Sequence, residues 1–271
     1  MALHVVTANV NGIRAALRRG GLDWLAGSGA DVLCLQEVRA TPEQVDEVLG
    51  ACGLGSWHLA LAPGARNGHA GVALLSRTPL ADVTLGVGPA EFADQGRWVE
   101  ASVEDPDGGP PVRVASVYVH TGEAEGPRAQ EKDRFLTAMG SWMAGHGGGA
   151  ALVCGDLNVA HTQQDIKNWR GNRGKAGFLE SERAHLDRWY ADAPDGLGWV
   201  DLGRRFGGDG PGPYTWWSWR GRGFDTDGGW RIDVVLASPG AAARATGVTV
   251  HKAPTYAERW SDHAPVSAAF A

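Results

Sequence analysis

The chain has 271 residues, 43% of them hydrophobic and 21% charged, which are the proportions of an ordinary globular protein. No apolar run approaches the about 18 residues that a membrane-spanning helix needs, so the transmembrane class is excluded. The formal net charge of −6 argues against a protein that holds nucleic acid through overall positive charge alone. Three widely spaced cysteines, Cys34, Cys52 and Cys154, fit neither a disulfide framework nor a zinc site, and we expect buried thiols.

The first predicted element is a strand over residues 3–10. The opening MALHVVTANV lacks a basic segment, and its short apolar stretch is interrupted by His4 and Thr7. This pattern is typical of a first strand rather than of an export signal, and it predicts a cytoplasmic protein.

Seven short β-rich runs predict the strands of a buried sheet system. In chain order they cover residues 3–10, 31–38, 71–76, 112–120, 150–157, 230–237 and 265–270. Helical patterns lie between some of them, at 12–27, 42–52 and 128–144. Strands mixed with helices predict the α/β class, and the absence of a repeat or a long linker favours one domain over residues 1–271.

Several predicted strands lead to a carboxylate or an amide at or near their end. Asn9 follows LHVVTA, Glu37 follows VLCLQ, and Asp156 follows ALVCG. Glu37 alone would be interpreted as a surface acid at a strand end. Because Asn158, Asp233 and Asp262 occupy comparable positions, we expect these groups to converge on one rim of the sheets.

A rim of carboxylates and amides suits a hard cation. Mg²⁺ prefers oxygen ligands and uses only one or two protein carboxylates beside substrate phosphate oxygens. Zinc would require closely spaced His and Cys, which the chain lacks. In GDLN, Asp156 and Asn158 are two residues apart and point to the same side of an extended segment. They could activate water and bind a phosphate oxygen, or they could form an Asx turn.

The segment SDHAPV places Asp262 beside His263 immediately before the last predicted strand. His263 could be a structural loop histidine. With Asp233 as an orienting partner, it could instead direct a hydrogen bond or an imidazolium at phosphate. The spacing leaves both interpretations open.

One stretch, residues 166–179, contains no acid and carries four cations, Lys167, Arg170, Arg173 and Lys175. It predicts a local basic face for a nucleic-acid backbone, and a basic solvated loop is the alternative.

In order along the chain, these segments resemble the exonuclease III and apurinic/apyrimidinic (AP) endonuclease family, within the endonuclease/exonuclease/phosphatase superfamily. The matching segments are TANVNGIRA (7–15), LQEVRA (35–40), AGVALLS (70–76), VYV (117–119), GDLNVAHTQQDIKN (155–168), AGFLESER (176–183), YTWW (214–217), GWRIDVVL (229–236) and SDHAPV (261–266). The resemblance implies a four-layer α/β sandwich, in which two packed mixed sheets are flanked by helices. It also implies a DNA repair phosphodiesterase that uses Mg²⁺, or alternatively Mn²⁺.

The resemblance implies a role for each site residue. Glu37 would be the main metal ligand, helped by Asn9 and Asp262. Asp156 would activate the attacking water. The remaining roles are contact with the scissile phosphate by Tyr118 and Asn158, and orientation of His263 by Asp233. In-line attack of water would leave a 3′-hydroxyl and a 5′-phosphate.

The resemblance also implies a DNA interface, with abasic sites or 3′ ends of duplex DNA as the partner. An apolar wall of Trp216, Trp230 and Ile232 would receive a flipped-out sugar without a base. The alternative is that these residues only pack in the strands of the core. The predicted backbone contacts are Asn11, Asn172, Lys167, Arg170, Arg173 and Lys175. The chain departs from the family in the VHTGEAEG segment after Tyr118 and at Lys175, where Asn is more common.

We therefore expect a monomeric, nucleoid-associated cytoplasmic enzyme with AP endonuclease activity, 3′ to 5′ exonuclease activity or both. Two alternatives are a phosphoesterase of lipid or inositol phosphates and an inert DNA-binding protein. The AGF and GWRID segments argue against the first, and the chemically competent residue at every proposed catalytic position argues against the second.

Overall fold

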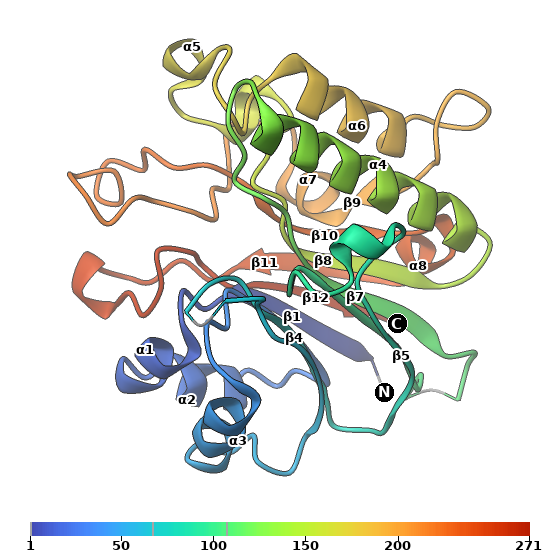
Figure 1. Cartoon of the computed structure of the whole chain (residues 1–271), viewed down its shortest axis with the longest axis vertical. Helices are drawn as coiled ribbons and strands as arrows, with labels where there is room; N and C mark the ends of the chain where they lie inside the picture. Colours follow the sequence, from blue (N-terminus) through green and yellow to red (C-terminus); the bar gives the residue numbers. More distant parts are fainter. Residues whose placement is uncertain (1, 67, 107) are drawn as a thin grey trace.

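The computed structural model describes residues 2–66, 68–106 and 108–271, which form two six-stranded sheets packed face to face (Figure 1). The first sheet has the order β11 (Ala245–Val250), β12 (Val266–Phe270), β1 (Leu3–Asn9), β2 (Val32–Gln36), β4 (Val72–Ser76) and β3 (His58–Ala62). The second has the order β5 (Leu80–Leu85), β6 (Trp98–Val103), β7 (Val112–Tyr118), β8 (Ala151–Asp156), β10 (Asp233–Ala237) and β9 (Val200–Asp201).

Helices cover the outer face of each sheet (Figure 1). The first sheet is covered by α1 (Ile13–Arg18), α2 (Gly21–Ala26) and α3 (Pro42–Gly50), and the second mainly by α4 (Pro127–His146) and α6 (Glu180–Tyr190). Shorter elements are α5 (Trp169–Asn172), α7 (Leu202–Gly207), α8 (Pro239–Arg244), η1 (Ala90–Phe92), η2 (Gln163–Asp165) and η3 (Tyr256–Glu258). The predicted four-layer α/β sandwich is confirmed.

Side-chain alternation along the strands explains the layers. In β2, Val32 and Cys34 face the core between the sheets, whereas Leu33 and Leu35 pack under the outer helices. In β8, Leu152 and Cys154 likewise enter the central core. Because β2 and β8 are buried on both faces, their sequences are mainly apolar runs, and this pattern predicted them as strands. The three cysteines are free and buried, as predicted.

Two predictions were incomplete. The helix predicted over 12–27 divides into α1 and α2, because Gly20 adopts a left-handed conformation with φ 77°. Five strands were not predicted: β3, β5, β6, β9 and β11. Within the described residues, no helix combines the length and the apolar character that crossing a bilayer requires.

The strand directions bring the strand ends to one edge. β1 and β2 are parallel, as are β7 and β8, so each pair ends at the same side. β10 runs antiparallel to β8 and starts with Asp233 opposite Asp156. β12 runs antiparallel to β1, so the segment that precedes β12 reaches this edge too.

Candidate active site

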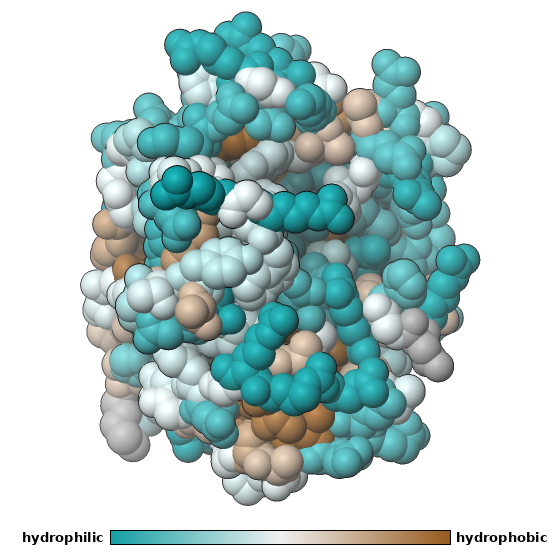
Figure 2. Space-filling view, turned by 90° about the vertical axis from the view of Figure 1, so that its left-hand side faces the viewer, coloured by the Kyte–Doolittle hydropathy of each residue, from teal (hydrophilic) through white to brown (hydrophobic). Residues whose placement is uncertain are grey.

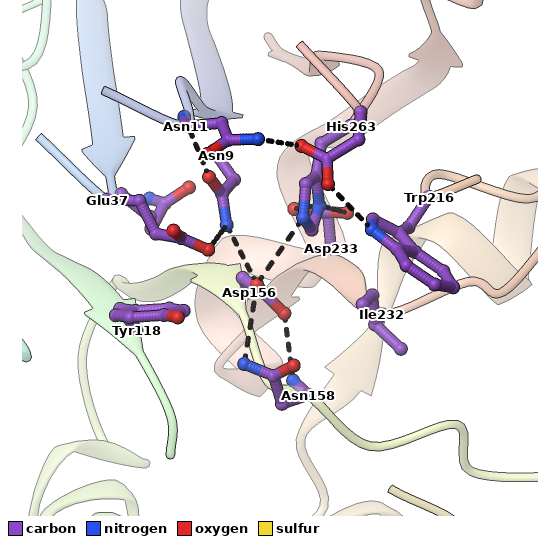
Figure 3. A network of polar contacts seen from close by, with 12 residues as sticks. Asn9, Asn11, Glu37, Tyr118, Asp156, Asn158, Trp216, Ile232, Asp233 and His263 are labelled. Carbon is purple, nitrogen blue, oxygen red and sulfur yellow. Dashed lines mark hydrogen bonds and ion pairs between the residues drawn. The ribbon is translucent and has the colours of Figure 1, made fainter. Parts of the chain in front are cut away.

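The polar centre spans the two sheets (Figure 3). Asn9, at the end of β1, donates from Nδ2 to Glu37 Oε1 at 2.8 Å and to Asp156 Oδ2 at 2.9 Å. Glu37, Asp156 and His263 are all buried, and each offers one potential ligand atom within 4.8 Å of the others. The structure therefore brings together side chains that lie more than 100 residues apart in sequence.

Four residues of this centre have left-handed backbone conformations, with φ of 47° at Asn11, 52° at Glu37, 51° at Arg39 and 50° at Asn158. Such a conformation is uncommon outside glycine and costs on the order of 1–3 kcal/mol, so the surrounding structure must impose it. The turn at Glu37 carries its carboxylate toward Asp156 rather than along the strand. Among the described residues, these are four of the seven non-glycine positions with positive φ, so the strained backbone is enriched at this cluster.

Gly155 allows a close approach between two neighbouring strands. Its φ is 150°, and a Cβ at this position would lie 2.0 Å from the carbonyl oxygen of Val117 in the neighbouring strand. No other residue fits between β7 and β8 here, so Asp156 is held next to the end of β7.

His263 is held by Asp233, whose Oδ2 lies 2.8 Å from Nδ1. Burial disfavours the imidazolium, but the Asp233 carboxylate and its hydrogen bond outweigh burial and, with Asp156 and Asp262, raise the pKa of His263 to about 10. The other ring nitrogen, Nε2, faces Asp156 Oδ2 at 3.8 Å. His263 can therefore present a proton toward Asp156 or toward a bound group.

The same buried, acidic surroundings disfavour the charged form of Asp156. Burial, together with the nearby Asp233 and Glu37 carboxylates, raises the pKa of Asp156 to about 7 despite the attraction of His263. Its Oδ1 accepts from the Asn158 backbone N–H at 2.9 Å. The carboxylate is thus oriented and strongly basic for an aspartate, which suits proton abstraction from water.

The other predicted metal ligands lie differently. Asp262 accepts from Asn11 Nδ2 at 2.6 Å and from Trp216 Nε1 at 3.2 Å. Asn9 turns its nitrogen toward the carboxylates, while its Oδ1 accepts from the Asn11 backbone N–H at 3.1 Å. Glu37 is therefore central, whereas Asp262 and the Asn9 oxygen lie to one side.

The two predicted phosphate-contacting residues flank Asp156. Burial, with Glu37 and Asp156 nearby, raises the pKa of the Tyr118 hydroxyl and keeps it a donor. Asn158 is oriented by its side chain, which donates to the Val119 carbonyl at 2.9 Å. The guanidinium of Arg97 stacks 4.8 Å from the Tyr118 ring centroid.

The predicted apolar wall is adjacent to Asp262 and His263. Trp216 and Trp230 meet edge to face with ring centroids 6.2 Å apart, and Trp216 also forms a single β-bridge with His263. Ile232 is buried and lies near Trp216 (Figure 3). Aromatic surface therefore lies next to the polar centre.

The predicted basic stretch surrounds α5. Lys167, Arg170, Arg173 and Lys175 are exposed, and within the described residues none of them forms an ion pair. Arg170 and Arg173 lie over the ring of Trp169, with guanidinium carbons 4.4 and 4.5 Å from its centroid. Asn172 is half-buried and donates to the Asn168 carbonyl at 2.8 Å. The side of the molecule with these loops is mainly hydrophilic, with scattered brown patches of which the most extensive lies in the lower part (Figure 2).

Asn11, predicted as a DNA contact, lies inside the centre, where its Oδ1 accepts from Arg39 Nη1 at 2.7 Å. Arg39, which also pairs with Glu37, was not predicted. Its position two residues after Glu37 could have indicated that both side chains point to the same side. The buried ion pair of Lys132 and Glu182, with Nζ and Oε1 2.7 Å apart, was also not predicted. Lys132 lies on the same helical face as the buried residues Phe135, Leu136 and Met139.

Comparisons with known proteins agree with the fold. A sequence profile of the Endonuclease/Exonuclease/phosphatase family matches residues 6–263. An exodeoxyribonuclease of Bacillus subtilis is 31% identical over 238 residues, covering 87% of this chain and 88% of that protein. The DNA repair nuclease APEX1 of Danio rerio is 29% identical over 268 residues, covering 98% and 81%. The structure of a 3′ phosphatase, NExo, from Neisseria bound to a product DNA hairpin matches with a TM-score of 0.86 and 28% identity over 100% of both chains.

Proposed function

Because the chain belongs to the endonuclease/exonuclease/phosphatase family, we propose that it is a Mg²⁺-dependent phosphodiesterase that incises abasic sites, removes nucleotides from 3′ ends, or does both. Its similarity to an exodeoxyribonuclease and to a DNA repair nuclease indicates a DNA repair nuclease that hydrolyses phosphodiester bonds. The observation that carries the proposal is the buried group of Glu37, Asp156 and His263, whose potential ligand atoms lie within 4.8 Å of one another.

The donor set fits Mg²⁺. Carboxylate oxygens of Glu37 and Asp156 are hard ligands, and Mg²⁺ needs only one or two of them in addition to water and phosphate oxygens. We propose that Glu37 is the principal ligand and that Asn9 and Asp262 support it. A bound Mg²⁺ would neutralise the charge that develops on the leaving oxygen.

The protein groups suit in-line hydrolysis. Asp156 accepts a proton from water as the water oxygen bonds to phosphorus, and the bond from phosphorus to the 3′ oxygen breaks. The products are a 3′-hydroxyl and a 5′-phosphate. His263, held by Asp233, donates a hydrogen bond to a phosphate oxygen, and Tyr118 and Asn158 do the same from the other side.

DNA would be recognised by two features outside the centre. The wall of Trp216, Trp230 and Ile232 would accept a flipped-out sugar that carries no base. A normal nucleotide would be disfavoured there, because its base must first be unstacked. The exposed cations Lys167, Arg170, Arg173 and Lys175 would contact the backbone, with Asn172 beside them. We further propose that residues 1–271 act as one catalytic domain, as a monomer, at cytoplasmic DNA.

The test is incision of a duplex that contains a tetrahydrofuran abasic site, compared with a recessed 3′ end and a 3′-phosphate. We expect cleavage with Mg²⁺, none after chelation with EDTA, and recovery when Mg²⁺ is added back. Absence of cleavage on all DNA substrates, with hydrolysis of an inositol phosphate instead, would refute the proposal.

A further inference from the structure

Lys132 is a buried lysine of α4 that lies behind the centre, and only 1% of it is exposed. Its Nζ donates to the carbonyl of Asn158 at 2.9 Å and to the carbonyl of Thr121 at 3.3 Å. Nζ also lies 2.7 Å from Oε1 of Glu182, which is itself buried. A buried ammonium is costly unless it is paired and hydrogen-bonded, so the fold retains this charge against a penalty.

The two carbonyls belong to the loops that follow β7 and β8. Thr121 lies three residues after Tyr118, and Asn158 lies two residues after Asp156. The loops also meet directly, because Asn158 Nδ2 donates to the Val119 carbonyl at 2.9 Å. Lys132 therefore closes a ring of contacts around the strained backbone of Asn158.

Glu182 anchors this lysine to the outer helix layer. It stands in the first turn of α6, where Oε2 accepts from the Leu179 backbone N–H at 3.0 Å while Oε1 faces Lys132. The loop passes close to the lysine stem, since a Cβ at Gly122 would lie 2.8 Å from Lys132 Cδ. Two helices and two loops thus meet at one ammonium group.

We propose that the Lys132–Glu182 pair, here called the clamp, positions Asn158 and the 118–121 segment for binding the phosphate in the transition state. Lys132 and Glu182 are positioning residues, because they act through Asn158 and Tyr118 and contact no reacting atom. The reaction that the clamp serves is the proposed phosphodiester hydrolysis, on which this inference rests.

The test compares two charge-neutral double variants. Lys132→Met with Glu182→Gln removes the clamp without leaving an unpaired buried charge. Arg113→Met with Glu100→Gln removes a remote pair, whose Nε and Oε2 are 3.0 Å apart near the start of β7. Each is assayed for kcat and KM on the abasic duplex and for Tm, and the Asn158 side-chain amide is followed by NMR.

For the clamp variant we expect kcat to fall on the order of 100-fold with little change in KM, as for a small misplacement of a group used in the transition state. The Asn158 amide resonances should move, whereas the control should change neither kcat nor these resonances at a comparable loss of Tm. If the clamp variant does not fold, Glu182→Gln alone should still lower kcat severalfold and shift the same resonances.

A clamp variant whose kcat matches that of the control would overturn the inference. If the wild-type protein cleaves no DNA, the proposed function fails, and the NMR comparison then decides the clamp alone. Unchanged Asn158 resonances in the clamp variant would refute it.

Discussion

Two buried charged regions meet in the segment GWRID, and they are built on opposite electrostatic principles. Arg231 pairs with Asp165 at 2.6 Å and with Asp201 at 2.7 Å, and Arg204 pairs with Asp165 too. Two residues later, Asp233 joins the candidate active site, where Asp262 is hydrogen-bonded to Asn11. Among the residues that the structure describes, the ion pairs of Glu37, Asp156 and Asp233 are with Arg39 and His263. The first region is balanced within itself, whereas the second carries excess negative charge.

The pKa values express this difference. Burial alone would raise the pKa of Asp165, but Arg231 and Arg204 lower it to about 2. Asp156, equally buried, has a pKa raised to about 7, because burial and neighbouring acids outweigh His263. The Arg231 network neutralises its own charge, as expected of a network that stabilises the fold. The excess negative charge around Asp156 would instead favour the binding of a metal cation.

The largest expected effect is on catalysis. Asp156→Asn removes the proposed proton acceptor, and we expect cleavage of the abasic duplex to fall by about 10³-fold or more while DNA binding persists. Single-turnover cleavage and binding of uncleaved duplex are the measurements. The surface variant Glu91→Gln, which breaks an exposed pair with Arg134, is the control. Unchanged cleavage would exclude Asp156 from the chemistry.

The same substitution in the balanced region should affect stability instead. Asp165→Asn leaves Arg231 and Arg204 without their shared carboxylate, and breaking such a buried pair costs about 3–5 kcal/mol of unfolding free energy. Urea unfolding measures it. A loss below 1 kcal/mol would mean that Asp201 alone balances the arginines.

Acid should weaken the balanced region. The folded pKa of Asp165 lies below its unfolded value of 3.8, so its stabilisation is present above pH 4 and is lost as the pH falls toward about 2. This difference corresponds to about 2 kcal/mol. Between pH 5 and 2, the difference in unfolding free energy between wild type and Asp165→Asn should narrow by about 2 kcal/mol. Parallel curves would show that Asp165 is not the group responsible.

The smallest effect has the opposite sign. Without metal, Asp156→Asn removes one charge from an excess, so the variant should be as stable as the wild type or more stable, by up to about 1 kcal/mol. Addition of Mg²⁺ should raise Tm more in the wild type than in the variant. A destabilised metal-free variant would show that the centre is balanced in a way that its direct contacts do not reveal.

The sequence predicted β1, β2, β7 and β8 well, because they are buried and mainly apolar, but it missed the buried strand β6, which carries Glu100 and Ser102. It missed β5, whose residues after Leu80 are exposed and give no hydrophobic pattern, and it missed the break at Gly20. Strand ends predicted the convergence of Asn9, Glu37 and Asp156. The left-handed turn at Glu37 and the reach of Lys132 to Asn158 depend on tertiary contacts that no local pattern contains.

The antiparallel pairing of β1 with β12 also has a consequence for synthesis. Asn9 emerges from the ribosome early, but Asp262 and His263 reach the centre only when β12 pairs with β1 and β11. A nascent chain that has already formed the middle strands still lacks the histidine of the centre. The proposed site is therefore complete only after β12 has been translated.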